Sequence, residues 1–306
     1  MNGLFRRQDG QVAVLTAIFM VALLGLAGIV LDVGSWFRQQ RATQATVDAA
    51  ALAGARSLPS DPATAVADAT SYANKNGGAA GATFTVTSTW TQNDTIKVVQ
   101  ARPASGFFSQ LFGVNTVTVR AHAAAVSEVP TAALGVAPIA VCICQQELSG
   151  AGCPCFDVST TLPLGKKGAP GAFGMINLDQ SKNGAVGTSM LAGWITNGYD
   201  QYLPLGGYFS DPGAKFNSSQ IQNALQGRYG TDLLFPVYDT LTGNGSNATY
   251  HVIAWAAFHL TNATASGNDG TLYGWFDRVI WAGIISQSGP PQNVPDLGVH
   301  SVALID

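Results

Sequence analysis

Apolar residues run without interruption near the start of the chain. Between Asp9 and Asp32 lie 22 residues, and none of them carries a charge. A helix rises about 1.5 Å per residue and the hydrocarbon core of a bilayer is about 30 Å thick, so this run is long enough to cross a membrane. A cleavable signal peptide has a shorter apolar core and ends in a small-residue cleavage site, which does not follow here. The pattern therefore predicts a retained membrane anchor rather than a signal peptide or a buried core helix.

The charges on either side of this run bear on its orientation. Arg6 and Arg7 precede the run, and Arg38 and Arg41 follow it, so the positive-inside count is close to a tie. A short N-terminal segment is easily left in the cytoplasm. We therefore expect a single-pass protein of the plasma (inner) membrane with a cytoplasmic N-terminus. Residues 35–306 would then be extracytoplasmic or at the cell surface.

A second helical pattern follows directly and is rich in alanine, a strong helix former. Gly54 and Pro59 end it. The pattern leaves two interpretations open: this stalk helix packs against copies of itself, or its alanines pack on the protein's own following domain. Residues at spacings of three and four share one face of the helix: Ala42, Ala45, Ala49 and Leu52.

Residues 61–128 combine one helical and several extended patterns. Asp61 and Pro62 are typical of a helix N-terminus, and Gly77 closes that helix. Alternation in 82–90 and 95–102 predicts a hairpin, and 115–127 predicts a further strand. We expect a small α/β head. An apolar cluster lies at helical spacing: Phe107, Phe108, Leu111 and Phe112. We expect it to pack against the sheet of this head rather than to form an aromatic binding patch.

The four cysteines form two C-x-C pairs, Cys142 with Cys144 and Cys153 with Cys155. Structural zinc sites usually use a wider C-x2-4-C spacing, so disulfides are favoured over a metal site, as suits an oxidising compartment. If both pairs lie on facing strands, Cys142 would meet Cys155 and Cys144 would meet Cys153. A redox C-x-x-C motif is absent from the sequence.

The remainder of the chain predicts a β-rich domain. Strand patterns occur at 171–179, 233–241, 249–260 and 272–286, and 206–230 holds one short helix. The third and fourth strand patterns are apolar on both faces, so we expect them to form the central hairpin of a buried sheet.

Composition limits the possible functions. Only 11% of residues are charged, the net charge is −3, and no basic stripe indicates nucleic-acid binding. His251 and His259 share one face of a strand but would lie about 26 Å apart, too far for a common site. No hydrolase, metalloprotease, P-loop or dinucleotide motif is present. We expect a protein that is not an enzyme and that has no cofactor or metal.

The N-terminal module resembles the TadE/TadG-like family of bitopic, pilin-related proteins in Flp-type (Tad) pilus assembly. The resemblance covers about the first 60 residues: a basic leader, the apolar run closed by an aspartate, and a D-A-A-A-L-A-G-A segment. Prepilin-type proteins carry Glu five residues after the cleaved glycine, whereas Leu15 stands five residues after Gly10. This departure favours an uncut, TadG-like anchor. The matching positions are Gly10, Asp32, Gly34, Gln44, Asp48 and the run from Ala49 to Ala55.

The interpretation is an α+β protein in three parts: a transmembrane and stalk helix (1–60), a small α/β head that the resemblance implies is pilin-like (61–130) and an extracytoplasmic β-rich domain with the four cysteines (131–306). The resemblance implies a non-enzymatic component of a Flp/Tad pilus assembly or secretion apparatus. Its partners would be the lipid bilayer, other Tad components and, through the anchor–stalk helix, copies of itself. The first alternative is a membrane-tethered adhesin or carbohydrate-binding protein, in which Trp194, Tyr199 and Tyr202 would line a groove. The second is an anchored envelope hydrolase, for which the sequence carries no motif. Candidate assembly residues are Asp32, Gly34, Gln44, Asp48, Ala49, Leu52 and Gly54.

Overall fold

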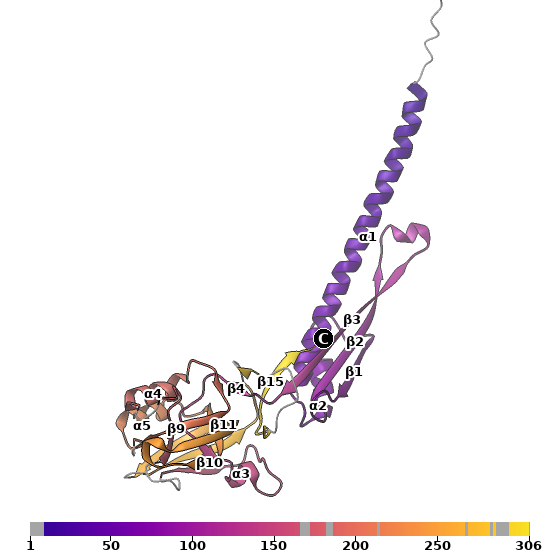
Figure 1. Ribbon diagram of the computed structural model, residues 1–306. Helices are drawn as coiled ribbons and strands as arrows, with labels where there is room; N and C mark the ends of the chain where they lie inside the picture. The colour runs from indigo at the N-terminus through magenta and orange to yellow at the C-terminus, as the bar shows by residue number, and fades with distance from the viewer. Residues whose placement is uncertain are drawn as a thin grey trace, which may run out of the picture. The chain divides into compact units, whose positions relative to one another are not determined.

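The computed structural model describes residues 9–165, 172–181, 186–212, 215–266, 269–281, 284–285 and 294–305. These residues form two compact units (Figure 1). Unit 1 comprises residues 1–126 and 303–306, and unit 2 comprises residues 127–302. A long apolar helix at the N-terminus and several sheets confirm the α+β class.

Unit 1 begins with one continuous helix, α1 (Asp9–Ala55), which includes both the charge-free run and the alanine-rich segment. Its 47 residues correspond to about 70 Å. Its most apolar window has a mean hydropathy of 2.7 and only 6% of that window is buried, so this part is not the core helix of a soluble domain. By length and composition, α1 is able to cross a membrane. We call residues 12–31 the apolar segment of α1.

The C-terminal half of α1 packs on the protein's own chain. Helix α2 (Pro62–Lys75) begins as predicted, with Asp61 Oδ1 accepting a hydrogen bond of 2.9 Å from the Thr64 amide and with Pro62 in the first turn. A Cβ added to Gly54 would lie 2.7 Å from the Ala65 carbonyl oxygen, so only glycine allows this approach. Of the two interpretations, packing on the following domain holds for the buried face of α1, which includes Thr43, Thr46, Val47, Ala50, Ala51 and Gly54.

Three antiparallel strands complete the unit, and the 82–102 hairpin is confirmed. The C-terminal end of a further strand, β15 (Val299–Leu304), lies next to the third of these strands in the sheet. There the Ile305 amide donates to the Ala124 carbonyl oxygen. A short 3-10 helix, η1 (Ser109–Phe112), connects the second and third strands. The strands are β1 (Ala82–Thr87), β2 (Thr95–Ser105) and β3 (Thr116–Glu128).

The predicted packing of the apolar cluster on the sheet is wrong. β1 pairs with β2 only as far as Gln100, whereas β2 and β3 stay paired to Ser105 and Thr116. The connection between β2 and β3 therefore lies beyond the three-stranded part of the sheet and runs alongside α1 (Figure 1). We call residues 106–115 the hairpin tip. Without a sheet face beneath them, three of its side chains are 77–79% exposed: Phe107, Leu111 and Phe112.

Unit 2 is built on a seven-stranded sheet whose main path runs β5–β10–β11–β12–β6. The expected central hairpin is confirmed, because β11 (Thr249–Ser266) and β12 (Asp269–Asp277) pair antiparallel in the middle of that path. The other strands of this sheet are β5 (Val141–Cys142), β6 (Thr160–Leu164), β7 (Ala172–Ile176), β9 (Gly206–Pro212) and β10 (Thr231–Thr242).

Both faces of β10 and β11 are buried, which explains their continuous apolar sequence. Phe235 and Phe258 stack on one face, and Tyr238 and Tyr250 contact each other on the other. The expected helix is α5 (Ser219–Gln226), and α4 (Thr188–Asn197) was not predicted. The remaining elements are α3 (Gln146–Ser149), η2 (Gly245–Asn247), β4 (Ala132–Ala133), β8 (Leu203–Pro204), β13 (Val279–Ile280) and β14 (Ile284–Ile285).

All four cysteines are disulfide-bonded, but the expected nested pairing is wrong. Cys142 pairs with Cys144 and Cys153 pairs with Cys155, with Cα–Cα distances of 5.0 and 4.5 Å. The nested pairing required two facing extended strands. Instead β5 ends at Cys142, a turn follows, and 153–155 is not a strand. Both pairs are closer than in an extended strand, in which alternate Cα atoms are about 7 Å apart, because the backbone turns after Cys142 and is irregular at 153–155.

Candidate functional site

Asp32, a buried carboxylate at the end of the charge-free run, joins α1 to the hairpin tip. Asp32 Oδ1 accepts hydrogen bonds from the backbone N–H groups of Phe107, at 2.6 Å, and Phe108, at 3.1 Å. Its Oδ2 accepts one from the backbone N–H of Ser109, at 2.5 Å. Three consecutive amides at the start of η1 thus share one carboxylate, which is the arrangement a helix N-terminus favours. Asp32 therefore fixes the hairpin tip to α1.

Two glycines make room for this contact. A Cβ at Gly28, one turn before Asp32, would lie 2.6 Å from Phe108 Cγ. A Cβ at Gly106 would lie 2.1 Å from Ser109 Oγ and 2.9 Å from Asp32 Oδ2. Close approach of the tip to the helix thus depends on the absence of a side chain at both positions.

Several polar groups of the hairpin tip bond within the tip itself. The Leu111 amide donates to the Phe108 carbonyl, the Gly113 amide to the Gln110 carbonyl, and the Val114 amide to the Ser109 carbonyl, each at 3.0 Å. Gly113 closes the turn with φ of 81°, in the left-handed region. The Gln110 and Ser109 side chains donate to the Gly106 and Val114 carbonyl oxygens. The outward-facing part of the tip consequently presents apolar side chains.

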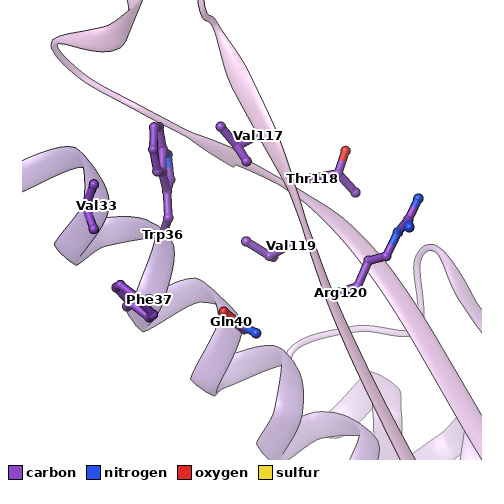
Figure 2. A pocket seen from close by; sticks show the side chains of 8 residues that line it. All are labelled: Val33, Trp36, Phe37, Gln40, Val117, Thr118, Val119 and Arg120. Carbon is purple, nitrogen blue, oxygen red and sulfur yellow. The ribbon is translucent and has the colours of Figure 1, made fainter. Parts of the chain in front are cut away.

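Next to the tip, a groove of about 550 Å³ lies between α1 and β3 (Figure 2). We call it the α1–β3 groove. Trp36 projects from the helix toward Val117 of the strand, and its indole Nε1 is buried without a hydrogen-bond partner in the described part of the chain. Arg120 extends from the strand at the far end of the groove. The full lining is Val33, Trp36, Phe37, Gln40, Val117, Thr118, Val119 and Arg120.

Three further candidate assembly residues also take part in contacts within the chain. Gln44 Nε2 donates to the His122 carbonyl oxygen of β3 and to Asp48 Oδ1, both at 2.7 Å. Asp48 therefore has a partner one turn away on its own helix, which the sequence did not reveal. These contacts, together with the packing of Gly54 against α2, hold the C-terminal half of α1 to the rest of unit 1.

The remaining candidates lie toward the outside of unit 1. Gly34 is exposed, and a Cβ there would meet nothing within 4 Å. Ala49 and Leu52 are half-buried, and they continue a stripe with the exposed Ala42 and Ala45. The face that the sequence singled out is thus the less buried side of this part of α1, and we call it the open face.

The histidines and aromatic residues of unit 2 do not assemble into a common site. His251 pairs with Asp239 and His259 with Asp232, each through Nδ1 at 2.8 Å, on separate cross-strand pairs. Among the described residues, no group of three His, Cys, Asp or Glu is placed to hold a metal ion. Tyr199 is buried against Trp194, with ring centroids 5.3 Å apart, so these two rings do not form an exposed binding row with Tyr202.

Sequence reasoning favoured core packing for the apolar residues of the hairpin tip over an aromatic binding patch. One signal was present: residues 103–119 carry no charge and are bracketed by Arg102 and Arg120. The sequence did not reveal that this uncharged segment packs on α1 at Gly28 and Asp32.

Comparison with known proteins confirms the resemblance of the N-terminal module. A family model described as putative Flp pilus-assembly TadE/G-like matches residues 10–57, which is less than a fifth of the 306-residue chain. The match begins near the N-terminal end of α1 and ends just beyond it. No curated protein and no solved structure matches the chain.

Proposed function

We propose that this protein is a non-enzymatic, single-pass membrane component of a Flp/Tad-type pilus assembly or secretion apparatus, of the TadG-like kind. In this proposal α1 crosses the inner membrane with its N-terminus in the cytoplasm. The remainder of unit 1 and all of unit 2 are extracytoplasmic.

One observation carries the proposal: the pilus-assembly family match covers α1 and almost nothing else. Within that match the apolar segment leaves its side chains exposed, as a lipid-facing helix does. The alanine-rich half of α1 instead packs on the rest of unit 1. Leu15 in place of the glutamate of processed pilins supports an uncut member of the membrane platform over a major pilin.

The same structure narrows the surface offered to other Tad components or to a second copy. Asp32, Gln44 and Gly54 serve contacts within unit 1, so their substitution would disturb the fold itself. Gly34, Ala49 and Leu52 belong to the open face of α1, and small residues on such a face permit close helix approach. We assign assembly contacts to this open face.

A deletion strain complemented with variants tests the proposal. We expect loss of surface pili in the deletion strain and restoration by the full-length gene. Gly34→Leu and Ala49→Leu should reduce pilus number and crosslinks to neighbouring Tad components while the protein accumulates normally. His251→Gln and His259→Gln, both in unit 2, serve as controls. Normal piliation in the deletion strain would reject the assembly role and direct attention to the adhesin alternative.

Fractionation tests the anchoring separately. The full-length protein should remain with membranes through a carbonate wash, and protease added from the outer side should remove everything beyond the anchor. A soluble species that begins near residues 30–35 would contradict a retained anchor.

A further inference from the structure

We propose that the hairpin tip is a second membrane contact, which enters the outer interface of the same bilayer that α1 crosses. The occupant of its exposed apolar surface is thus lipid. The inference rests on the proposed function in one respect, namely that α1 spans the membrane, and its test separates the two.

The position of the tip along α1 sets its depth. The uncharged run between Asp9 and Asp32 has 22 residues and a length of about 33 Å, against a hydrocarbon core of about 30 Å. When this run fills the core, Asp32 lies at the outer boundary. Phe108 packs on Gly28, four residues or about 6 Å nearer the membrane centre. Amphipathic segments at membrane surfaces bury their apolar face about 5–10 Å deep, which is the depth the tip reaches.

The chemistry of the tip suits this depth. Phe107, Leu111 and Phe112 are 77–79% exposed, and no charge occurs anywhere in residues 103–119. An exposed apolar cluster of this kind marks an interaction surface, and this one is held next to the exposed apolar segment of α1. The two apolar surfaces therefore lie next to each other.

The residues that follow outward along α1 and β3 form the pattern of a membrane–water interface. Trp36 and Phe37 lie one turn beyond Asp32, and Trp36 lines the α1–β3 groove. Aromatic rings concentrate at the headgroup level of bilayers. Three exposed arginines come next, at positions where they would meet lipid phosphates: Arg38, Arg41 and Arg120.

The backbone of the tip is prepared for an environment poor in water. Lipid tolerates non-helical backbone only where its N–H and C=O groups have partners. Asp32 accepts from the amides of residues 107–109, and the amides of residues 111, 113 and 114 bond within the tip. These amides therefore have partners within the protein, as a lipid environment requires.

A spin-label experiment tests the inference on the full-length protein in nanodiscs of phosphatidylethanolamine and phosphatidylglycerol, with one copy per disc. All four native cysteines are paired, so a single introduced cysteine takes the label without reduction. Labels are placed at Leu111→Cys in the tip, at Leu24→Cys in the apolar segment, and at Gln92→Cys in the exposed β1–β2 turn. Relaxation by oxygen, which concentrates in lipid, is compared with relaxation by a neutral nickel chelate, which concentrates in water.

We expect the oxygen-to-nickel ratio at position 111 to be several times that at position 92 and lower than that at position 24. Phe112→Cys, another exposed tip position, should repeat the result. A water-like ratio at 111 with a lipid-like ratio at 24 would overturn the tip contact and leave the anchor intact. Exclusion of both reagents at 111 would mean that protein covers the tip, and would also overturn the inference. A water-like ratio at 24 would reject the anchor together with the tip.

Discussion

Asp32 Oδ1 lies 2.6 Å from the backbone nitrogen of Phe107, although 75 positions of sequence separate the two residues. Asp32 is the aspartate that closes the apolar run and belongs to the segment matched by the pilus-assembly family model. In this chain its structural role is to hold an uncharged hairpin tip beside the helix that is long enough to cross a membrane.

Asp32→Asn should release the tip. An amide side chain keeps only one acceptor oxygen for the three N–H groups of residues 107–109 and brings its own N–H toward them. We expect faster hydrogen exchange at those three amides, measured by mass spectrometry in detergent. Asp48→Asn is the matched control, because its remaining oxygen still accepts from Gln44 and it does not contact the tip. Equal exchange in the two variants would contradict the role given to Asp32.

Gly28→Ala should displace Phe108, whereas Gly25→Ala should not disturb the tip. The two sites lie one turn apart on the same helix, and both substitutions remove a glycine that costs about 1 kcal/mol of helix propensity. Only at Gly28 would the new Cβ meet a neighbour, at 2.6 Å from Phe108 Cγ, while nothing lies within 4 Å at Gly25. Exchange at residues 107–109 again provides the measurement. A similar response at both sites would mean that Phe108 is not held against Gly28.

Gly54→Ala should destabilise unit 1 even though alanine is the better helix former. The added Cβ would lie 2.7 Å from the Ala65 carbonyl oxygen and from Ile96 Cδ1, and a backbone neighbour cannot move aside cheaply. Overpacking of this kind costs about 1–3 kcal/mol, so a net loss of up to about 2 kcal/mol remains after the gain of about 1 kcal/mol in propensity. Gly34→Ala, which meets nothing within 4 Å, is the control and should retain or slightly increase the midpoint of thermal unfolding. An unchanged midpoint for Gly54→Ala would argue against the close α1–α2 packing.

The disulfide pairing can be tested by one protease. Glu147 lies between the two C-x-C pairs and is one of only two glutamates in the chain, with Glu128. Cleavage of the denatured, unreduced protein at glutamate should release residues 129–147 as a separate peptide with its own disulfide. The nested pairing would leave this peptide attached until reduction. Because each bridge closes a very short loop, removing one should cost only about 1–2 kcal/mol.

Asp94 should contribute to the loss of stability of unit 1 as the pH falls. Burial raises the pKa of this carboxyl, but hydrogen bonds from the backbone of residues 89–91 and from the Thr95 hydroxyl outweigh it, so the pKa lies below its usual value. A lowered folded pKa gives stability that is present above the unfolded value, about 3.9, and is lost as the pH falls through the folded value. Asp94→Asn should therefore reduce the difference in unfolding midpoint between pH 7 and pH 3. A difference as large as in the unsubstituted protein would refute this.

The sequence by itself determined the elements whose causes are local. A charge-free run of 22 residues, the Asp61–Pro62 helix start, and the alternation of 82–102 each depend on neighbours a few positions away. The structure has the long helix, α2 and the hairpin at those places. The double-sided apolar pattern of 249–260 likewise identified the central β11–β12 hairpin.

Only the tertiary structure decided which surfaces are covered and which residues meet. Whether Phe112 is core or exposed depends on β1 ending before β2 and β3 do, which no property of residues 106–115 reveals. The pairing of Cys142 depends on the turn after β5, and the roles of Asp32, Gln44 and Gly54 depend on what lies opposite α1. Periodicity identifies the apolar face of an element, but the partner of that face is set by strand lengths and by contacts between distant parts of the chain.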